Sequence, residues 1–149
     1  MSLLNSIQKG KENKPPRLFI YGNEGIGKSL FSASAPSPVF IQTEDGLGEI
    51  DCAKFPLARS TSDVQDALAA LRDEPHDFQT VVIDSADWLE RLIWDQVCAE
   101  FGVRNIEKAD GGFGKGYVHA LTHWRKTVGI LDELRNQRGM IVILIAHSK

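Results

Sequence analysis

The chain has 149 residues, and 42% of them are hydrophobic, which is enough material for one globular domain with a buried core. A formal net charge of −3 excludes a globally basic nucleic-acid binder, although a local basic groove is compatible with it. No apolar run approaches the length of a membrane span, the N-terminus has no signal-peptide pattern, and Cys52 and Cys98 lack metal-site spacing. We therefore expect reduced thiols, a cytoplasmic location and no membrane partner.

In chain order, a polar segment comes first and a strand–loop–helix unit follows. Residues 1–16 end in two prolines and are predicted to form an N-terminal arm. Residues 17–21 have the composition of a short buried strand, and an apolar helix is predicted to open soon after residue 29.

The loop between that strand and that helix fits the phosphate-loop (Walker A) pattern, with two glycines five apart and then Lys28 and Ser29. Glycines let successive backbone N–H groups face one anion at the start of a helix. We expect Lys28 to reach the β- and γ-phosphates of ATP and the Ser29 hydroxyl to hold Mg²⁺. The alternative is an ordinary glycine-rich turn, which the strand–loop–helix context disfavours. The predicted nucleotide-binding residues are Gly22, Asn23, Glu24, Gly25, Ile26, Gly27, Lys28, Ser29 and Leu30.

The middle of the chain predicts two strands and a helix. Residues 39–43 form a second strand, and residues 55–58 are a weaker strand candidate. Residues 60–73 have the periodicity of an amphipathic helix, and Ser62 with Gln65 three positions later resembles a capping box.

In the second half of the chain, predicted strands again alternate with predicted helices. Residues 80–83 are a continuous apolar, β-branched run, typical of a central parallel strand covered on both faces. Helices are predicted over residues 86–101 and 117–137, with a long connection between them, and residues 140–145 form the most hydrophobic strand. The residues assigned to the buried faces of these helices are Trp88, Leu89, Leu92, Ile93, Trp94, Val97, Leu121, Trp124, Val128, Leu131 and Leu134.

This alternation predicts an α/β fold, a three-layer phosphate-loop NTPase with a mostly parallel sheet flanked by helices. Right-handed crossovers place the carboxyl ends of all strands on one rim, where ligands bind. The phosphate loop, Glu44, Asp84 and His147 all stand at such ends.

Two acidic residues and a histidine at these ends have candidate roles. Asp84 has the form of the residue that assists Mg²⁺ in phosphate-loop ATPases; the alternative is a helix N-cap, a place that Ser85 can take instead. No glutamate follows Asp84, so the general base must lie elsewhere, and Glu44 is the best candidate to orient the attacking water. The alternative for Glu44 is a solvated acidic turn. His147 either faces the ligand or is a satisfied core histidine.

A glycine-rich loop at residues 111–117 holds Phe113 and Lys115 between glycines. It is either a flexible connection or a surface that stacks on a strand of nucleic acid and neutralises its charge.

These motifs, in this order, resemble the core of the RecA-type ATPases. The resemblance implies that Glu44 is the catalytic base and that His147, where that family commonly has Gln, senses the γ-phosphate and signals to a DNA-binding loop. Together with Lys28, these are the expected catalytic residues, and Ser29 and Asp84 are the expected metal ligands.

The resemblance also implies an order of strands. The strand ending at His147 should lie between those beginning at Arg17 and Thr80, which leaves an unpaired edge beyond the first strand. The likeness covers residues 17–149, which we expect to be the core domain and a fragment of a longer protein rather than a minimal core.

Residues 113–117 and 145–149 look more closely like the small RecA-like ATPases of bacteriophages, some of which act as single-strand annealing recombinases. This likeness implies ATP and Mg²⁺ as cofactors, a role in phage DNA recombination or annealing, single-stranded DNA as a partner and a homo-oligomer.

Two other functions fit the same residues. A nucleotide-gated DNA-binding or loader module would hydrolyse little ATP. A small-molecule phosphate-loop kinase needs arginines near the phosphates, and the long connection supplies only Arg104. We expect the isolated chain to be a weak ATPase, because Lys149 is the only further cation at the predicted strand ends.

Overall fold

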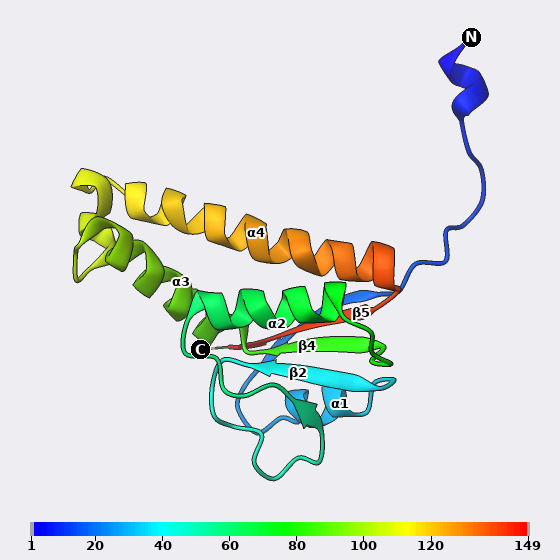
Figure 1. The fold of residues 1–149 in the computed structure, drawn as a ribbon, viewed down its shortest axis with the longest axis horizontal. Coiled ribbons are helices and arrows are strands. Elements are labelled where there is room, and N and C mark those ends of the chain that lie inside the picture. The colour runs from blue at the N-terminus through cyan, green and yellow to red at the C-terminus, as the bar shows by residue number, and fades with distance from the viewer. Residues whose placement is uncertain (1, 149) are drawn as a thin grey trace.

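The computed structural model describes residues 2–148, whose centre is a five-stranded sheet with the order β1-β5-β4-β2-β3 (Figure 1). Every pair of neighbouring strands is parallel, and β4 is the central strand, as the sequence predicts. The strands are β1 (Arg17–Gly22), β2 (Pro38–Gln42), β3 (Ala53–Lys54), β4 (Thr80–Asp84) and β5 (Ile141–His147).

Helices cover both faces of this sheet, so the predicted three-layer α/β fold is confirmed (Figure 1). Helices α2, α3 and α4 lie on one face, while α1 and the segment after β2 lie on the other. None of the helices in the described part of the chain is both long enough and apolar enough to cross a bilayer. The helices are η1 (Leu3–Ser6), α1 (Lys28–Ala33), α2 (Thr61–Asp73), α3 (Ala86–Phe101), η2 (Ile106–Gly111) and α4 (Lys115–Arg138).

The side chains of the inner strands β4 and β5 alternate between the two cores. In β4, Val81 and Ile83 pack with α2, α3 and α4, whereas Val82 packs on the opposite side. Successive strand residues point to opposite faces, so a strand covered on both faces must be apolar throughout. This is why β4 and β5 stand out in the sequence as continuous hydrophobic runs.

Two local predictions in the middle of the chain are wrong. The strand candidate at residues 55–58 is displaced, because the short strand β3 pairs with β2 at Ala53 and Lys54. Helix α2 is capped by Ser60, whose hydroxyl accepts from the Asp63 N–H at 3.2 Å; Ser62 does not cap it. The Asp63 carboxylate in turn accepts from the Arg59 N–H. The capping residue is therefore Ser60, two positions before the predicted Ser62.

The buried face of α4 also differs from the predicted one. Leu121 and Val128 are exposed, whereas Ala120 and Thr127 are buried. Thr127 tolerates burial because its hydroxyl donates to the His123 carbonyl oxygen and accepts from the Gln65 amide.

The predicted burial of the tryptophans holds only in part. Trp88 is exposed, with the Arg91 guanidinium 4.2 Å from the centre of its ring, an arrangement that a cation–π contact favours. Trp94 and Trp124 are half-buried and pack against the core.

The sheet has a free edge at β1. Among the described residues β1 pairs only with β5, and its Phe19 and Tyr21 side chains are 62% and 70% exposed. The strand order matches the one that the RecA-type resemblance implies. The N-terminal segment that precedes β1 extends away from the body of the protein (Figure 1).

Candidate functional site

The carboxyl ends of β1, β5, β4 and β2 bring the predicted site residues together. In the sheet register Gly22 is paired with His147, and Gln42 with Asp84. Since the strands are parallel, the loops that follow them leave the same edge of the sheet. A cavity of about 320 Å³ lies there, lined by Glu24, Gly25, Gly27, Lys28, Ser29, Leu30, Glu44, Gly46, Ile50 and His147.

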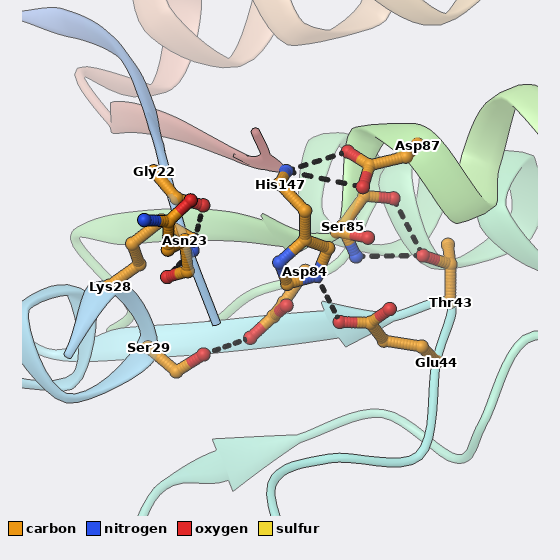
Figure 2. A network of polar contacts seen from close by, with 10 residues as sticks. All are labelled: Gly22, Asn23, Lys28, Ser29, Thr43, Glu44, Asp84, Ser85, Asp87 and His147. Carbon is orange, nitrogen blue, oxygen red and sulfur yellow. Dashed lines mark hydrogen bonds and ion pairs between the residues drawn. The ribbon is translucent and has the colours of Figure 1, made fainter. Parts of the chain in front are cut away.

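Two glycines shape the backbone of the phosphate loop. The Lys28 side chain folds back toward Gly22 and Asn23 in the same loop (Figure 2). Gly25 and Gly27 have φ angles of 77° and 99°, in a region that side chains disfavour. Lys28 is buried, with 7% of the residue exposed. Its ammonium group donates to the carbonyl oxygens of Gly22 at 2.6 Å and Asn23 at 2.8 Å. The lysine therefore lies folded against its own loop.

Asp84 is tied to the residue after that lysine. The Ser29 hydroxyl donates to Asp84 Oδ2 at 2.6 Å, and Asp84 is buried. Burial raises the pKa of Asp84, and the nearby Glu44 charge acts in the same direction, while the Ser29 hydrogen bond opposes both. A hydroxyl and a carboxylate in contact are the hard oxygen donors that Mg²⁺ prefers, so the donor set fits this metal.

Glu44 and His147 form a second contact beside the first. His147 Nε2 lies 2.7 Å from Glu44 Oε1, and with Glu44 ionised the Nε2–H donates. His147 Nδ1 is buried and has no hydrogen-bond partner among the described residues. The His147 backbone N–H donates to both carboxylate oxygens of Asp87, each at 3.1 Å.

Glu44, Asp84 and His147 form one cluster. Each offers one possible ligand atom, and these atoms all lie within 4.8 Å of one another. The cluster places two carboxylates and an imidazole directly beside the phosphate loop, an arrangement that suits a divalent cation and an attacking water.

A model of the AAA domain family matches residues 14–149 of this chain. The chain belongs to this family. It is therefore a P-loop ATPase-like AAA domain, a group that generally binds nucleotide together with Mg²⁺.

This AAA domain is also similar to the SPbeta prophage-derived uncharacterized protein YorG of Bacillus subtilis (strain 168). The two are 26% identical over 149 residues, a match that covers 95% of this chain and 43% of YorG. The AAA domain thus spans less than half the length of this relative.

Only some of the remaining predicted nucleotide-binding residues of the AAA domain line the cavity. Glu24 and Leu30 line the cavity, whereas the Ile26 side chain is exposed and is not part of that lining. Asn23 Oδ1 accepts from the Ser148 hydroxyl at 2.8 Å, so this side chain faces the end of β5. Lys149, the expected additional cation, lies outside the described residues.

Ser85 does not cap α3 as expected. It occupies the N-cap position, but its side chain makes no capping hydrogen bond. Its backbone instead binds the hydroxyl of Thr43, a contact between residues 42 positions apart. Asp84 does not cap the helix either, since the N-cap position belongs to Ser85.

Three residues near the AAA-domain site were missed in the sequence: Thr43, Asp87 and Ser148. The sequence indicates these residues only by their positions. Thr43 and Ser148 are next to predicted site residues, and Asp87 is the acidic residue in the first turn of α3. Their contacts join segments that lie far apart in the sequence, and no local pattern encodes them.

Proposed function

We propose that this chain is the ATP-binding and ATP-hydrolysing, RecA-like core of a phage protein that acts in DNA recombination or single-strand annealing. The observation that carries the proposal is the convergence of Lys28, Ser29, Glu44, Asp84 and His147 at one edge of the sheet. Membership of the AAA domain family supports nucleotide binding, and the prophage-derived relative supports a phage context.

Each residue has one task in this proposal. Bound Mg²⁺ supplies positive charge that offsets the negative charge of the phosphates. Ser29 Oγ and an Asp84 carboxylate oxygen would hold the metal, and the Lys28 ammonium would exchange its two carbonyl partners for phosphate oxygens. The Glu44 carboxylate accepts a proton from the attacking water, and the His147 imidazole senses the γ-phosphate.

The DNA-binding part of the proposal rests on the loop before α4. Phe113 is 99% exposed at its tip, and Lys115 follows at the start of α4. An exposed aromatic ring beside a cation suits stacking on a base of single-stranded DNA and pairing with its phosphates. The free edge of β1 supports association of copies into a homo-oligomer.

The structure favours this function over a small-molecule kinase. Arg104, the only arginine of the long connection, lines a separate cavity with Trp94 and Tyr117. It does not line the cavity at the phosphate loop, where a kinase needs cations close to the phosphates.

Calorimetry with ATP and turnover assays test the proposal. Lys28→Ala should weaken ATP binding by about 2–4 kcal/mol, by analogy with the loss of a close charge pair. Lys11→Ala, which removes an exposed lysine of the N-terminal segment, is the matched control and should bind as the wild type does. Equal ATP affinity in wild type and Lys28→Ala overturns the assignment of the phosphate loop.

Hydrolysis measured with and without single-stranded DNA separates the remaining functions. A rise in turnover on adding DNA supports a recombination or annealing ATPase. ATP-dependent DNA binding without turnover identifies a loader, and transfer of phosphate to a small molecule identifies a kinase.

A further inference from the structure

Thr43 joins the two segments that carry Glu44 and Asp84 (Figure 2). Its hydroxyl donates to the Ser85 carbonyl oxygen at 2.7 Å and accepts from the Ser85 N–H at 2.8 Å. Its own N–H donates to the Asp84 carbonyl oxygen at 2.9 Å. Thr43 is 5% exposed and Ser85 is fully buried, so water is not available to replace these hydrogen bonds.

These contacts begin where the pairing of β2 with β4 ends. Gln42 and Asp84 are the last paired residues of the two strands, and beyond them the chain turns away into a loop on one side and into α3 on the other. The Thr43 hydroxyl therefore bridges the two segments just beyond the paired strands, next to the backbone hydrogen bond from the Thr43 N–H to the Asp84 carbonyl oxygen. Glu44 directly follows Thr43 in the sequence, and Asp84 directly precedes Ser85.

The other side of the same segment is anchored as well. The Gln42 carbonyl oxygen accepts from the Ala58 N–H at 2.9 Å, and the Gln42 side-chain amide donates to the Phe55 carbonyl oxygen at 2.8 Å. The end of β2 is thus fixed on both sides, and Thr43 provides the fixation toward Asp84. A rigid backbone at this point limits how far the two carboxylates can move apart.

We propose that Thr43 is a positioning residue of the nucleotide site. Through Ser85 it holds Asp84 against Ser29, and through its own backbone it holds the neighbouring Glu44 at a fixed separation from Asp84. Thr43 itself contacts neither nucleotide nor metal in this role. The inference rests on the proposed function, because it assigns Thr43 to the metal and the water of ATP hydrolysis.

The test compares Thr43→Val, which keeps the shape of the side chain and removes the hydroxyl, with Thr43→Ser, which keeps the hydroxyl. Thr61→Val is the matched control, since Thr61 is also buried and its hydroxyl bonds to Gln96 at 3.3 Å. Thermal unfolding first shows that each variant folds. Two quantities are then measured for each: the ratio of ATP affinity with Mg²⁺ to ATP affinity in EDTA, and the single-turnover rate.

In Thr43→Val both quantities should fall by about 10- to 100-fold, the usual cost of losing a residue that orients a metal ligand or a reacting group. Thr43→Ser and Thr61→Val should keep wild-type values. Wild-type behaviour of Thr43→Val overturns the role, as does an equal loss in a folded Thr43→Ser, which would point to packing of the methyl group. If Thr43→Val does not fold, Thr43→Cys replaces it, because a thiol is a much weaker hydrogen-bonding group.

Failure of the proposed function gives a different result. If the wild type binds ATP more tightly with Mg²⁺ but does not hydrolyse it, the hydrolytic function fails and the affinity ratio alone decides the role of Thr43. If the wild type does not bind ATP, the proposed function and the role of Thr43 are both overturned.

Discussion

The carboxylate of Glu44 and the imidazole of His147, 103 positions apart in the chain, lie in direct contact, with 2.7 Å between Oε1 and Nε2. A carboxylate that accepts a hydrogen bond from an imidazole has one lone pair fewer for a water. Under the proposed function this contact holds the general base in a resting arrangement, and hydrolysis requires Glu44 to turn toward the water or to share its second oxygen with it.

Glu44→Gln should bind ATP about as well as the wild type and lose turnover, because an amide keeps the shape of the side chain but cannot accept the proton of the water. Glu100→Gln is the matched control: Glu100 also contacts a histidine, with 3.0 Å between its Oε1 and His123 Nε2, but it lies away from the cavity. Single-turnover assays at saturating ATP make the comparison. Hydrolysis at the wild-type rate by Glu44→Gln means that another group is the base.

Under the proposed function the protein binds single-stranded DNA more tightly with ATP than with ADP, and His147→Ala should remove this preference while leaving ATP binding largely intact. One hydrogen bond to a charged group, about 1.5–3 kcal/mol, shifts such an equilibrium about ten- to a hundredfold. DNA affinity is measured in both nucleotide states at one salt concentration, since salt alone changes it strongly. His123→Ala is the control, because the His123 and His147 side chains are almost equally exposed, at 22% and 23%. If the ratio of DNA affinity with ATP to DNA affinity with ADP is unchanged in His147→Ala, His147 has only a structural role at the end of β5.

Asp84→Asn should stabilise the nucleotide-free protein while weakening the effect of Mg²⁺ on ATP binding. Burial raises the pKa of Asp84, so keeping this carboxyl ionised in the folded protein costs free energy. The stability that the protonated carboxyl gives is present below the unfolded-state pKa and is lost as the pH rises through the higher folded-state value. The melting temperature of Asp84→Asn should therefore exceed that of the wild type near pH 7, by about 2–4 °C for each kcal/mol gained.

The difference between Asp84→Asn and wild type should vanish in acid, where the wild-type carboxyl is also neutral. Thermal unfolding across this pH range gives the measurement. A variant that melts below the wild type near neutral pH, or a difference that does not change with pH, contradicts the prediction.

Gly116→Ala should destabilise the protein by about 1–3 kcal/mol, the usual cost of overpacking. A Cβ atom at Gly116 would clash with the Ile106 carbonyl oxygen, so α4 and η2 can approach this closely only with glycine at the contact. Gly129→Ala in the same helix is the control. A Cβ there meets nothing within 4 Å, and alanine should stabilise α4 by about 0.8–1.0 kcal/mol. Denaturant unfolding of both variants measures the difference, and opposite signs are expected.

The sequence predicts β4 and β5 well because both strands are covered on both faces. Most residues of Thr80–Asp84 and Ile141–His147 are apolar, so each strand stands out as a hydrophobic run. Strand β1 is predicted at the right place but not with the right burial, since its Phe19 and Tyr21 side chains are exposed. The strand β3 is only two residues long and exposed, which leaves no periodic signal, and the prediction at residues 55–58 is accordingly displaced.

Helix α4 shows a different limit. A stripe of leucine, tryptophan and valine suggests one face, but the helix buries Ala120 and Thr127 beside it, and small or hydrogen-bonded residues of this kind carry little hydrophobic signal. Among the site residues, Lys28, Ser29, Glu44 and Asp84 can be selected from motifs that follow strands. Thr43 and Asp87 cannot, since their partners become neighbours only when the sheet has formed.

The pairing of β1 with β5 also determines when the nucleotide site can form as the chain folds. Arg17 is aligned with Val142, so the strand that supports the phosphate loop finds its only described sheet partner near the other end of the sequence. Closing so long a stretch of chain is entropically costly and slow compared with forming the helices between. During synthesis the phosphate loop leaves the ribosome before β5 does, and it has no completed support until β5 follows. A nascent chain that has not yet produced β5 should therefore have no affinity for ATP.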